Sequence, residues 1–228
     1  MKVILKKTVG IFLVAVILLS LFTLTSCNRG YVEEDVISST AALLKEAEVL
    51  NMIYYGSGIE YYDSNEATGY YRKANIAHLE ELGFSTVDEL KALTEKTFSD
   101  AYTTLLYSTI LSALSDDSGI VRAARYYQAY DENTNEPTFI MVYSAFTPMF
   151  KDSIEYDYSS LRVEKSKKER VYVKVDATVT NSEGKSQQVT LTVILVEEAD
   201  GWKIDNPTYA NYNEAKDRYD ELKNQDIK

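Results

Sequence analysis

The hydrophobic and polar positions of this chain follow three successive patterns. An almost unbroken apolar run comes first, at Val9–Phe22. A helical period follows, in which apolar side chains recur every three or four positions over Val36–Tyr54. Such spacing predicts an amphipathic helix, and Gly56-Ser57-Gly58 is a typical place for it to end. In the second half of the chain the period changes to two.

A second helical pattern runs from Thr86 to about Leu114. It opens on a capping box, in which Thr86 caps the helix and Glu89 reaches back to the cap. Ser99-Asp100 is a second capping pair, so we expect a bend there. The stretch Ile59–Gly83, between the two helical patterns, is less regular.

The period-two segments predict an antiparallel sheet. In the clearest of them, apolar side chains alternate with polar ones, which is typical of a half-buried strand. Helices followed by strands predict an α+β domain in which N-terminal helices pack on one face of a curved antiparallel sheet. The expected strands are Arg125–Tyr130, Thr138–Tyr143, a short one from Ser160 to Glu164, Val171–Thr180, Val189–Val196 and Trp202–Ile204, and a last polar helix is expected at Asn213–Lys228.

The N-terminus has the three parts of an export signal. Met1–Lys7 is basic, the apolar run follows, and small residues lead to Cys27. Leu24-Thr25-Ser26-Cys27 resembles the lipobox of bacterial lipoproteins, which are cut before a lipidated cysteine. The alternative is a transmembrane anchor, but the 16 residues of Val9–Leu24 fall short of the roughly 20 that a span needs. We therefore expect an extracytoplasmic lipoprotein with fatty acids such as palmitate on Cys27.

The predicted organisation is a signal peptide (1–26), a lipidated tether (27–32), one domain (33–209) and a C-terminal polar helix (210–228). The whole chain of 228 residues has a formal net charge of -11, and because its first 26 residues hold three lysines and no acid, the remainder carries -14. A surface this acidic repels nucleic acid and anionic lipid and favours basic partners. Cys27 is the only cysteine, so no internal disulfide can form.

Residues for catalysis or metal binding are sparse. His78 is the only histidine, and no Cys/His cluster of the kind that binds zinc exists. Ser182–Lys185 matches S-x-x-K but falls in an expected hairpin turn. Asp131–Glu136 begins like a calcium loop, yet it lacks the glycine at the sixth position and has Val142 at the twelfth. We predict no catalytic residue, no metal site and no cofactor.

Tyrosine is the unusual component, with 19 residues, many of them in doublets. Tyrosine combines apolar area with a polar tip, which suits packing and binding alike. For the strand doublet Tyr126-Tyr127 we expect one ring to pack inward and the other to lie half-exposed. For Tyr61, Tyr62 and Tyr70, in the irregular stretch, a binding role and a packing role both stay open.

The segment Asp200-Gly201-Trp202-Lys203-Ile204-Asp205 resembles the last strand of cone-shaped NTF2-like and cystatin-like domains. Phe84-Ser85-Thr86 with Leu90, and Thr97-Phe98-Ser99, resemble the helical part of secreted Firmicutes members, which include inhibitors of cell-wall DL-endopeptidases. The chain departs from these inhibitors in its lipobox and in the helix expected after Tyr209, and none of their functional residues can be matched to a position here.

The sequence as a whole favours a non-enzymatic, membrane-anchored binding module for an envelope protein or a cell-wall component, and the resemblance implies a more specific role. Its sharpest form is the inhibition of a peptidoglycan hydrolase. The alternative is a small-ligand binder, or an isomerase- or dehydratase-like enzyme, that uses the cavity of the cone. A buried carboxyl group beside His78 in a deep pocket would favour that alternative.

Overall fold

The computed structural model describes residues 31–62, 69–116, 119–148, 153–167, 169–181 and 183–208. Its contacts divide the chain into two compact units, one up to Asp35 and one from Val36 onward, and the fold described below belongs to the second. Cys27, the signal peptide and the expected helix at Asn213–Lys228 lie outside the described residues. No helix in the described ranges is long and apolar enough to cross a membrane.

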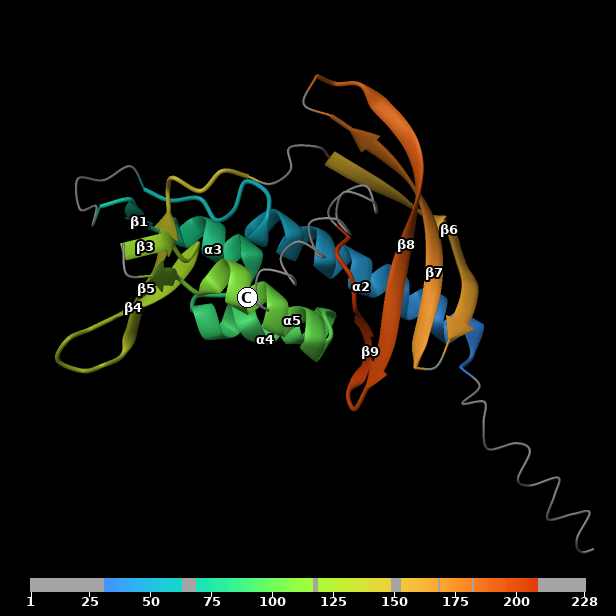
Figure 1. Ribbon diagram of the computed structural model, residues 1–228, viewed down its shortest axis with the longest axis horizontal. Coiled ribbons are helices and arrows are strands. Elements are labelled where there is room, and N and C mark those ends of the chain that lie inside the picture. The colour runs from blue at the N-terminus through green and yellow to red at the C-terminus, as the bar shows by residue number, and fades with distance from the viewer. Residues whose placement is uncertain are drawn as a thin grey trace, which may run out of the picture. The chain divides into compact units, whose positions relative to one another are not determined.

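The first expected helix is confirmed as α2, Glu33–Tyr54 (Figure 1). Acidic residues fill its first turn, where carboxylates interact favourably with the helix dipole. The helix ends before Gly58, whose φ of 84° lies in the left-handed region that glycine adopts without strain. The helix buries one stripe of side chains, which includes Val36, Leu44, Leu50 and Tyr54.

The second helical pattern is divided in two, as the capping residues predict. The capping box of Thr86 and Glu89 is formed, and the Ser99 hydroxyl accepts a hydrogen bond from the Tyr102 amide at the start of the next helix. A further short helix, capped by the Asn75 side chain, lies within the stretch Ile59–Gly83 that has the less regular pattern. The helices are α3 (Ile76–Leu82), α4 (Val87–Thr97), α5 (Asp100–Leu106) and a π-helical turn, η1 (Tyr107–Leu111).

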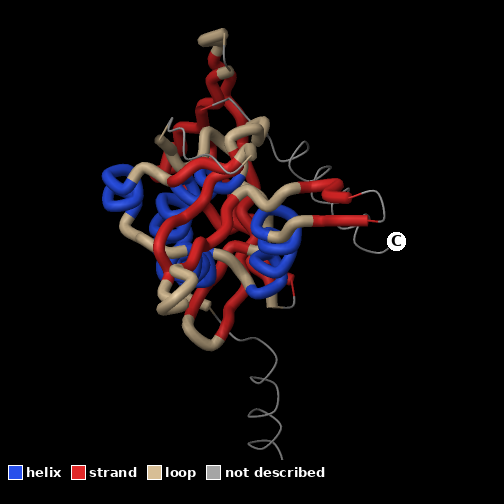
Figure 2. Tube along the Cα trace, turned by 90° about the vertical axis from the view of Figure 1, so that its left-hand side faces the viewer, coloured by secondary structure: helices blue, strands red, loops and turns tan. Residues whose placement is uncertain are grey.

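The described strands are all antiparallel to their neighbours, and together with the helices they confirm the α+β class (Figure 2, strands in red). They do not form the one curved sheet that was expected, because they divide among three sheets. The first sheet has the order β1-β5-β4, with β1 at Tyr71–Lys73, β5 at Pro137–Tyr143 and β4 at Tyr126–Tyr130. The second pairs β2 (Leu114–Asp116) with β3 (Gly119–Arg122). The third has the order β6-β7-β8-β9, at Ser153–Lys167, Arg170–Thr180, Ser186–Glu198 and Gly201–Ile204.

The single-sheet expectation was wrong because periodicity reports which residues are strands and not which strands pair. The far side of β5 is occupied by β1, a three-residue strand from the stretch read as irregular. The expected short strand at Ser160–Glu164 is part of the much longer β6, whose mostly exposed side chains hide the alternation. The β2–β3 pair was not expected at all.

The hydrophobic core of the third sheet follows the predicted alternation. Val171, Val173, Val175 and Ala177 of β7 are all buried. The register pairs Val175 with Leu191 and Ala177 with Val189, so the apolar side chains of β7 and β8 share one side. The predicted pairing of these two strands around a polar turn is confirmed.

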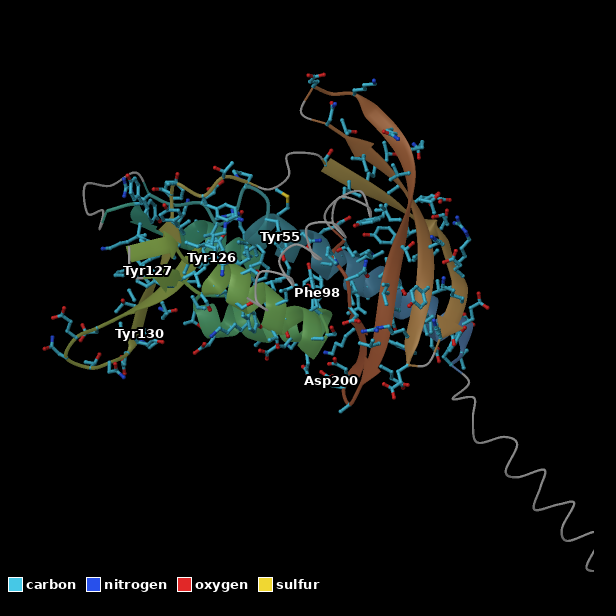
Figure 3. The ribbon with its side chains drawn as sticks, viewed as in Figure 1. Tyr55, Phe98, Tyr126, Tyr127, Tyr130 and Asp200 are labelled. Atoms are coloured by element: carbon cyan, nitrogen blue, oxygen red, sulfur yellow. The ribbon has the colours of Figure 1, made fainter. Side chains whose placement is uncertain are left out.

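The segment Asp200–Asp205 fastens this sheet to the helices. The buried ammonium group of Lys203 donates to the carbonyl oxygens of Glu95 and Lys96 at the end of α4, and to the Asp200 carboxylate. Ser99, between α4 and α5, donates its amide to the Ile204 carbonyl and its hydroxyl to the Asp205 carboxylate, 2.5 Å away. The motif therefore serves packing, and Figure 3 labels Asp200 together with Phe98, which forms a bridge to Ile204.

Candidate binding surface

The doublet Tyr126-Tyr127 divides between the two sides of β4. Tyr126 is fully buried, and its hydroxyl donates to the Ile53 carbonyl at 2.6 Å and accepts from the Ile59 amide at 3.2 Å. Tyr127 is 37% exposed. Figure 3 shows the two rings leaving β4 at neighbouring positions, with Tyr126 nearer to the helices. The predicted inward and outward split is confirmed.

Tyr127 is one of several aromatic side chains that meet on the outer side of the first sheet. The rings of Tyr71 and Tyr127 pack edge to face, with centroids 4.8 Å apart, and the ring of Tyr143 lies 5.3 Å from that of Tyr71. Tyr70 packs against Tyr143 at 6.0 Å. The Lys73 ammonium lies 4.4 Å from the centroid of the Phe139 ring. We call Tyr70, Tyr71, Lys73, Tyr127, Phe139, Met141 and Tyr143 the aromatic face.

The strand register explains why these residues share a side. Lys73 and Tyr127 both lie opposite Met141, one on each neighbouring strand, and Tyr71 lies opposite Tyr143. Directly opposed residues of an antiparallel pair point to the same side of the sheet. Phe139 is two positions from Met141 and therefore points the same way.

The other side of the same sheet packs against helices. Tyr126, Ile140 and Val142 are buried there. The Tyr126 hydroxyl reaches the last turn of α2, and the Gln128 side chain accepts a hydrogen bond from the Val87 amide at the start of α4. The helices thus hold one side of the sheet in place and leave the aromatic face on the other.

The aromatic face is well ordered internally and nearly uncharged. The Tyr71 hydroxyl donates to the Ala124 carbonyl at 2.7 Å, which fixes the ring at the centre of the cluster. Partial burial, and then the neighbouring phenols of Tyr127 and Tyr143, raise the pKa of Tyr71, so this phenol stays neutral and able to donate at neutral pH. Lys73 is the only charged residue in the set.

The three tyrosines singled out from the sequence lie at or beside this face. Tyr70 belongs to it and is 67% exposed. Tyr61 and Tyr62 are also exposed, but they are not in an irregular loop: Tyr61 forms a bridge to Ala74, and the Tyr62 amide donates to the Lys73 carbonyl. They extend the edge of the sheet next to β1.

Four aromatic residues of the face were missed from the sequence: Tyr71, Tyr127, Phe139 and Tyr143. The sequence does carry a signal for them. Phe139 and Tyr143 lie an even number of positions apart on β5, and Tyr71 and Tyr127 belong to the doublets Tyr70-Tyr71 and Tyr126-Tyr127. That signal indicates which rings point outward from each strand. It does not show that β1 joins β5, and this pairing is what gathers the rings.

His78 has a structural contact in α3. Its Nδ1 atom accepts a hydrogen bond from the Glu60 amide at 2.9 Å. The Asn75 amide group lies 3.4 Å from the Glu60 carboxylate. These contacts hold the segment before Tyr61 against the start of α3. Within the described ranges, no three His, Cys, Asp or Glu side chains are close enough to hold a metal ion.

The segment that begins like a calcium loop is the tip of the β4–β5 hairpin. One oxygen of the Asp131 carboxylate accepts from the amides of Asn133 and Thr134. These backbone hydrogen bonds, that from Thr134 first, lower the pKa of Asp131. Asn135 adopts a left-handed conformation, with φ 56°. The carboxylate therefore organises a turn, as the hairpin interpretation predicts.

Arg125, immediately before β4, is a buried arginine that no pattern in the sequence indicates. The Arg125 side chain is almost fully buried, donates from Nη2 to the Gly56 carbonyl and stacks 3.8 Å from the centroid of the Phe146 ring. Burial lowers its pKa. A Cβ atom on Gly58 would lie 2.2 Å from Arg125 Nη2, so this glycine is required for the close approach. Arg125 thereby links the end of α2 to β4.

Comparison of this chain with protein-family models, with curated proteins and with solved structures finds no match.

Proposed function

We propose that this chain is a membrane-anchored envelope lipoprotein that acts as a non-enzymatic binding module, with its binding surface on the aromatic face. In this proposal the lipid on Cys27 holds an extracytoplasmic domain of NTF2-like or cystatin-like type at a membrane. The domain binds an envelope protein or a cell-wall component. The sequence features that support the anchor are the basic start, the short apolar run and the lipobox-like residues that end at Cys27.

The observation that carries the binding role is the gathering of partly exposed aromatic rings on one supported side of a sheet. Tyrosine side chains bury large areas at low cost in conformational entropy, and aromatic residues dominate the energetics of interfaces. The rings are already packed against one another and the opposite side of the sheet is fixed by α2 and α4. A ligand would therefore meet a surface that needs little further ordering.

The sharpest version of the proposal is the regulation of a cell-wall hydrolase. It is supported by the resemblance of the Asp200–Asp205 segment and of the helical part to secreted DL-endopeptidase inhibitors. The formal charge of -14 beyond residue 26 would speed the encounter with a basic partner at low salt.

The proposal is tested with the full-length protein purified in detergent micelles. Its binding is measured to the purified catalytic domain of a DL-endopeptidase and to purified cell-wall sacculi. Tyr127→Ala should weaken binding to whichever of the two is the ligand by more than about tenfold, which corresponds to about 1.4 kcal/mol.

Tyr172→Ala is the matched control. Tyr172 lies on β7 of the third sheet between the buried Val171 and Val173, so its half-buried ring belongs to the other side of that sheet. Like Phe139 on the aromatic face, it has a lysine ammonium over its ring, that of Lys165 at 4.8 Å. If neither ligand binds, or if the two variants weaken binding equally, the aromatic face is not the binding surface.

A further inference from the structure

We infer that the ligand of the aromatic face is a polysaccharide, namely the glycan strand of a cell wall, bound through its sugar rings. This inference rests on the proposed function, because it names the ligand class for the same surface. Two features of the structure support a glycan over a protein: the charge of the face and the way its rings are held.

The charge of the aromatic face does not suit a basic protein. Its seven residues include one cation, Lys73, and no carboxylate, whereas the chain beyond residue 26 carries -14. A basic partner is drawn to regions of opposite potential. The charge of the chain would therefore speed the encounter with such a partner, but it gives this face no preference as the docking site. A sugar ring presents uncharged C–H groups and hydroxyls, which need no opposite charge.

The rings of the aromatic face are held in place by contacts with one another and are not loose side chains. Tyr71 is fixed by its hydrogen bond to the Ala124 carbonyl and by edge-to-face packing against Tyr127. An aromatic ring has a negative face, on which the slightly positive C–H groups of a pyranose can stack. The phenol oxygens at the rims can exchange hydrogen bonds with sugar hydroxyls.

The test is co-sedimentation of the full-length protein in detergent micelles with insoluble glycans. The probes are cell-wall sacculi stripped of protein, chitin as a polymer of N-acetylglucosamine, and cellulose as a polymer of glucose. We expect binding to sacculi and to chitin. Because stacking on uncharged rings is not screened by ions, the dissociation constant should change by less than about threefold between 0.05 and 0.5 M salt. Tyr127→Ala should weaken binding at least tenfold, and the control Tyr172→Ala, in the third sheet, by less than twofold.

The possible results separate this inference from the proposed function. Binding to a DL-endopeptidase domain without binding to any glycan would overturn the inference and leave the proposed function standing. Glycan binding that is lost at 0.5 M salt, or that survives Tyr127→Ala unchanged, would also overturn it. If the protein binds neither class of ligand, both the inference and the proposed function fail.

Discussion

The doublet Tyr126-Tyr127 allows the structural and binding roles of one strand to be separated by the removal of a single oxygen atom. In Tyr126→Phe the buried ring is kept, but the hydrogen bonds to the Ile53 carbonyl and from the Ile59 amide are lost. In Tyr127→Phe the same oxygen is removed from a partly exposed ring. The two variants have the same composition and differ only in the side of β4 that they alter.

The expected magnitudes follow from the burial of the two groups. A hydrogen bond inside a protein contributes about 0.5–1.5 kcal/mol, and a polar group left buried without a partner costs more. Tyr126→Phe should therefore lower the free energy of unfolding by about 1–3 kcal/mol. For a domain of this size, each kcal/mol shifts the melting temperature by about 2–4 °C. Tyr127→Phe should stay within about 0.5 kcal/mol of the wild type, as is usual for surface changes.

Urea unfolding of both variants, followed by tryptophan fluorescence and far-UV circular dichroism, measures these differences. Binding of the folded variants to the ligand is measured in parallel. Tyr126→Phe should keep its affinity while losing stability, since the aromatic face is untouched. Equal loss of stability in both variants would show that the assignment of inner and outer sides of β4 is wrong, and with it the aromatic face.

Three further predictions concern other parts of the chain. Cys27→Ala should abolish the incorporation of labelled fatty acid in cells, and equal labelling of both proteins would exclude lipidation at this site. Val175→Asp places a carboxylate at a fully buried position of β7 and should lower the free energy of unfolding by several kcal/mol. An unchanged urea midpoint would contradict the register. The control is Thr178→Asp, on the other side of the same strand. The Glu89 carboxylate accepts from the Ser85 amide and hydroxyl and from the Thr86 amide, which lowers its pKa. Because the folded pKa lies below the ordinary carboxyl value, its stabilisation is complete at pH 7 and is lost as the pH falls below about 4. The advantage of the wild type over Glu89→Gln in urea unfolding should therefore shrink from pH 7 to pH 3, and a constant difference would show that the charge has no role.

Local features of the fold could be predicted from the sequence because their causes are local. The amphipathic stripe of α2 and the alternation of β7 each record which side of one element is buried. The capping box of Thr86 and Glu89 and the cap at Ser99 involve residues within a few positions of one another, so the bend between α4 and α5 was visible in advance. The turn between β7 and β8 was predictable for the same reason.

The candidate binding surface was only partly visible, because it depends on contacts between distant segments. Tyr70 was identified, but Tyr71, Tyr127 and Tyr143 come together beside it only because β1 and β4 both pair with β5, which begins more than 60 positions after β1. The doublet Tyr126-Tyr127 predicts that its two rings separate, but not which of them turns inward. That choice depends on the Ile53 carbonyl, at the end of a helix 73 positions away, which the Tyr126 hydroxyl reaches. The spacing of buried positions is a property of one helix or strand, so it can be read from the sequence of that segment. Which other segment covers each side of a strand is decided only when the segments pack together.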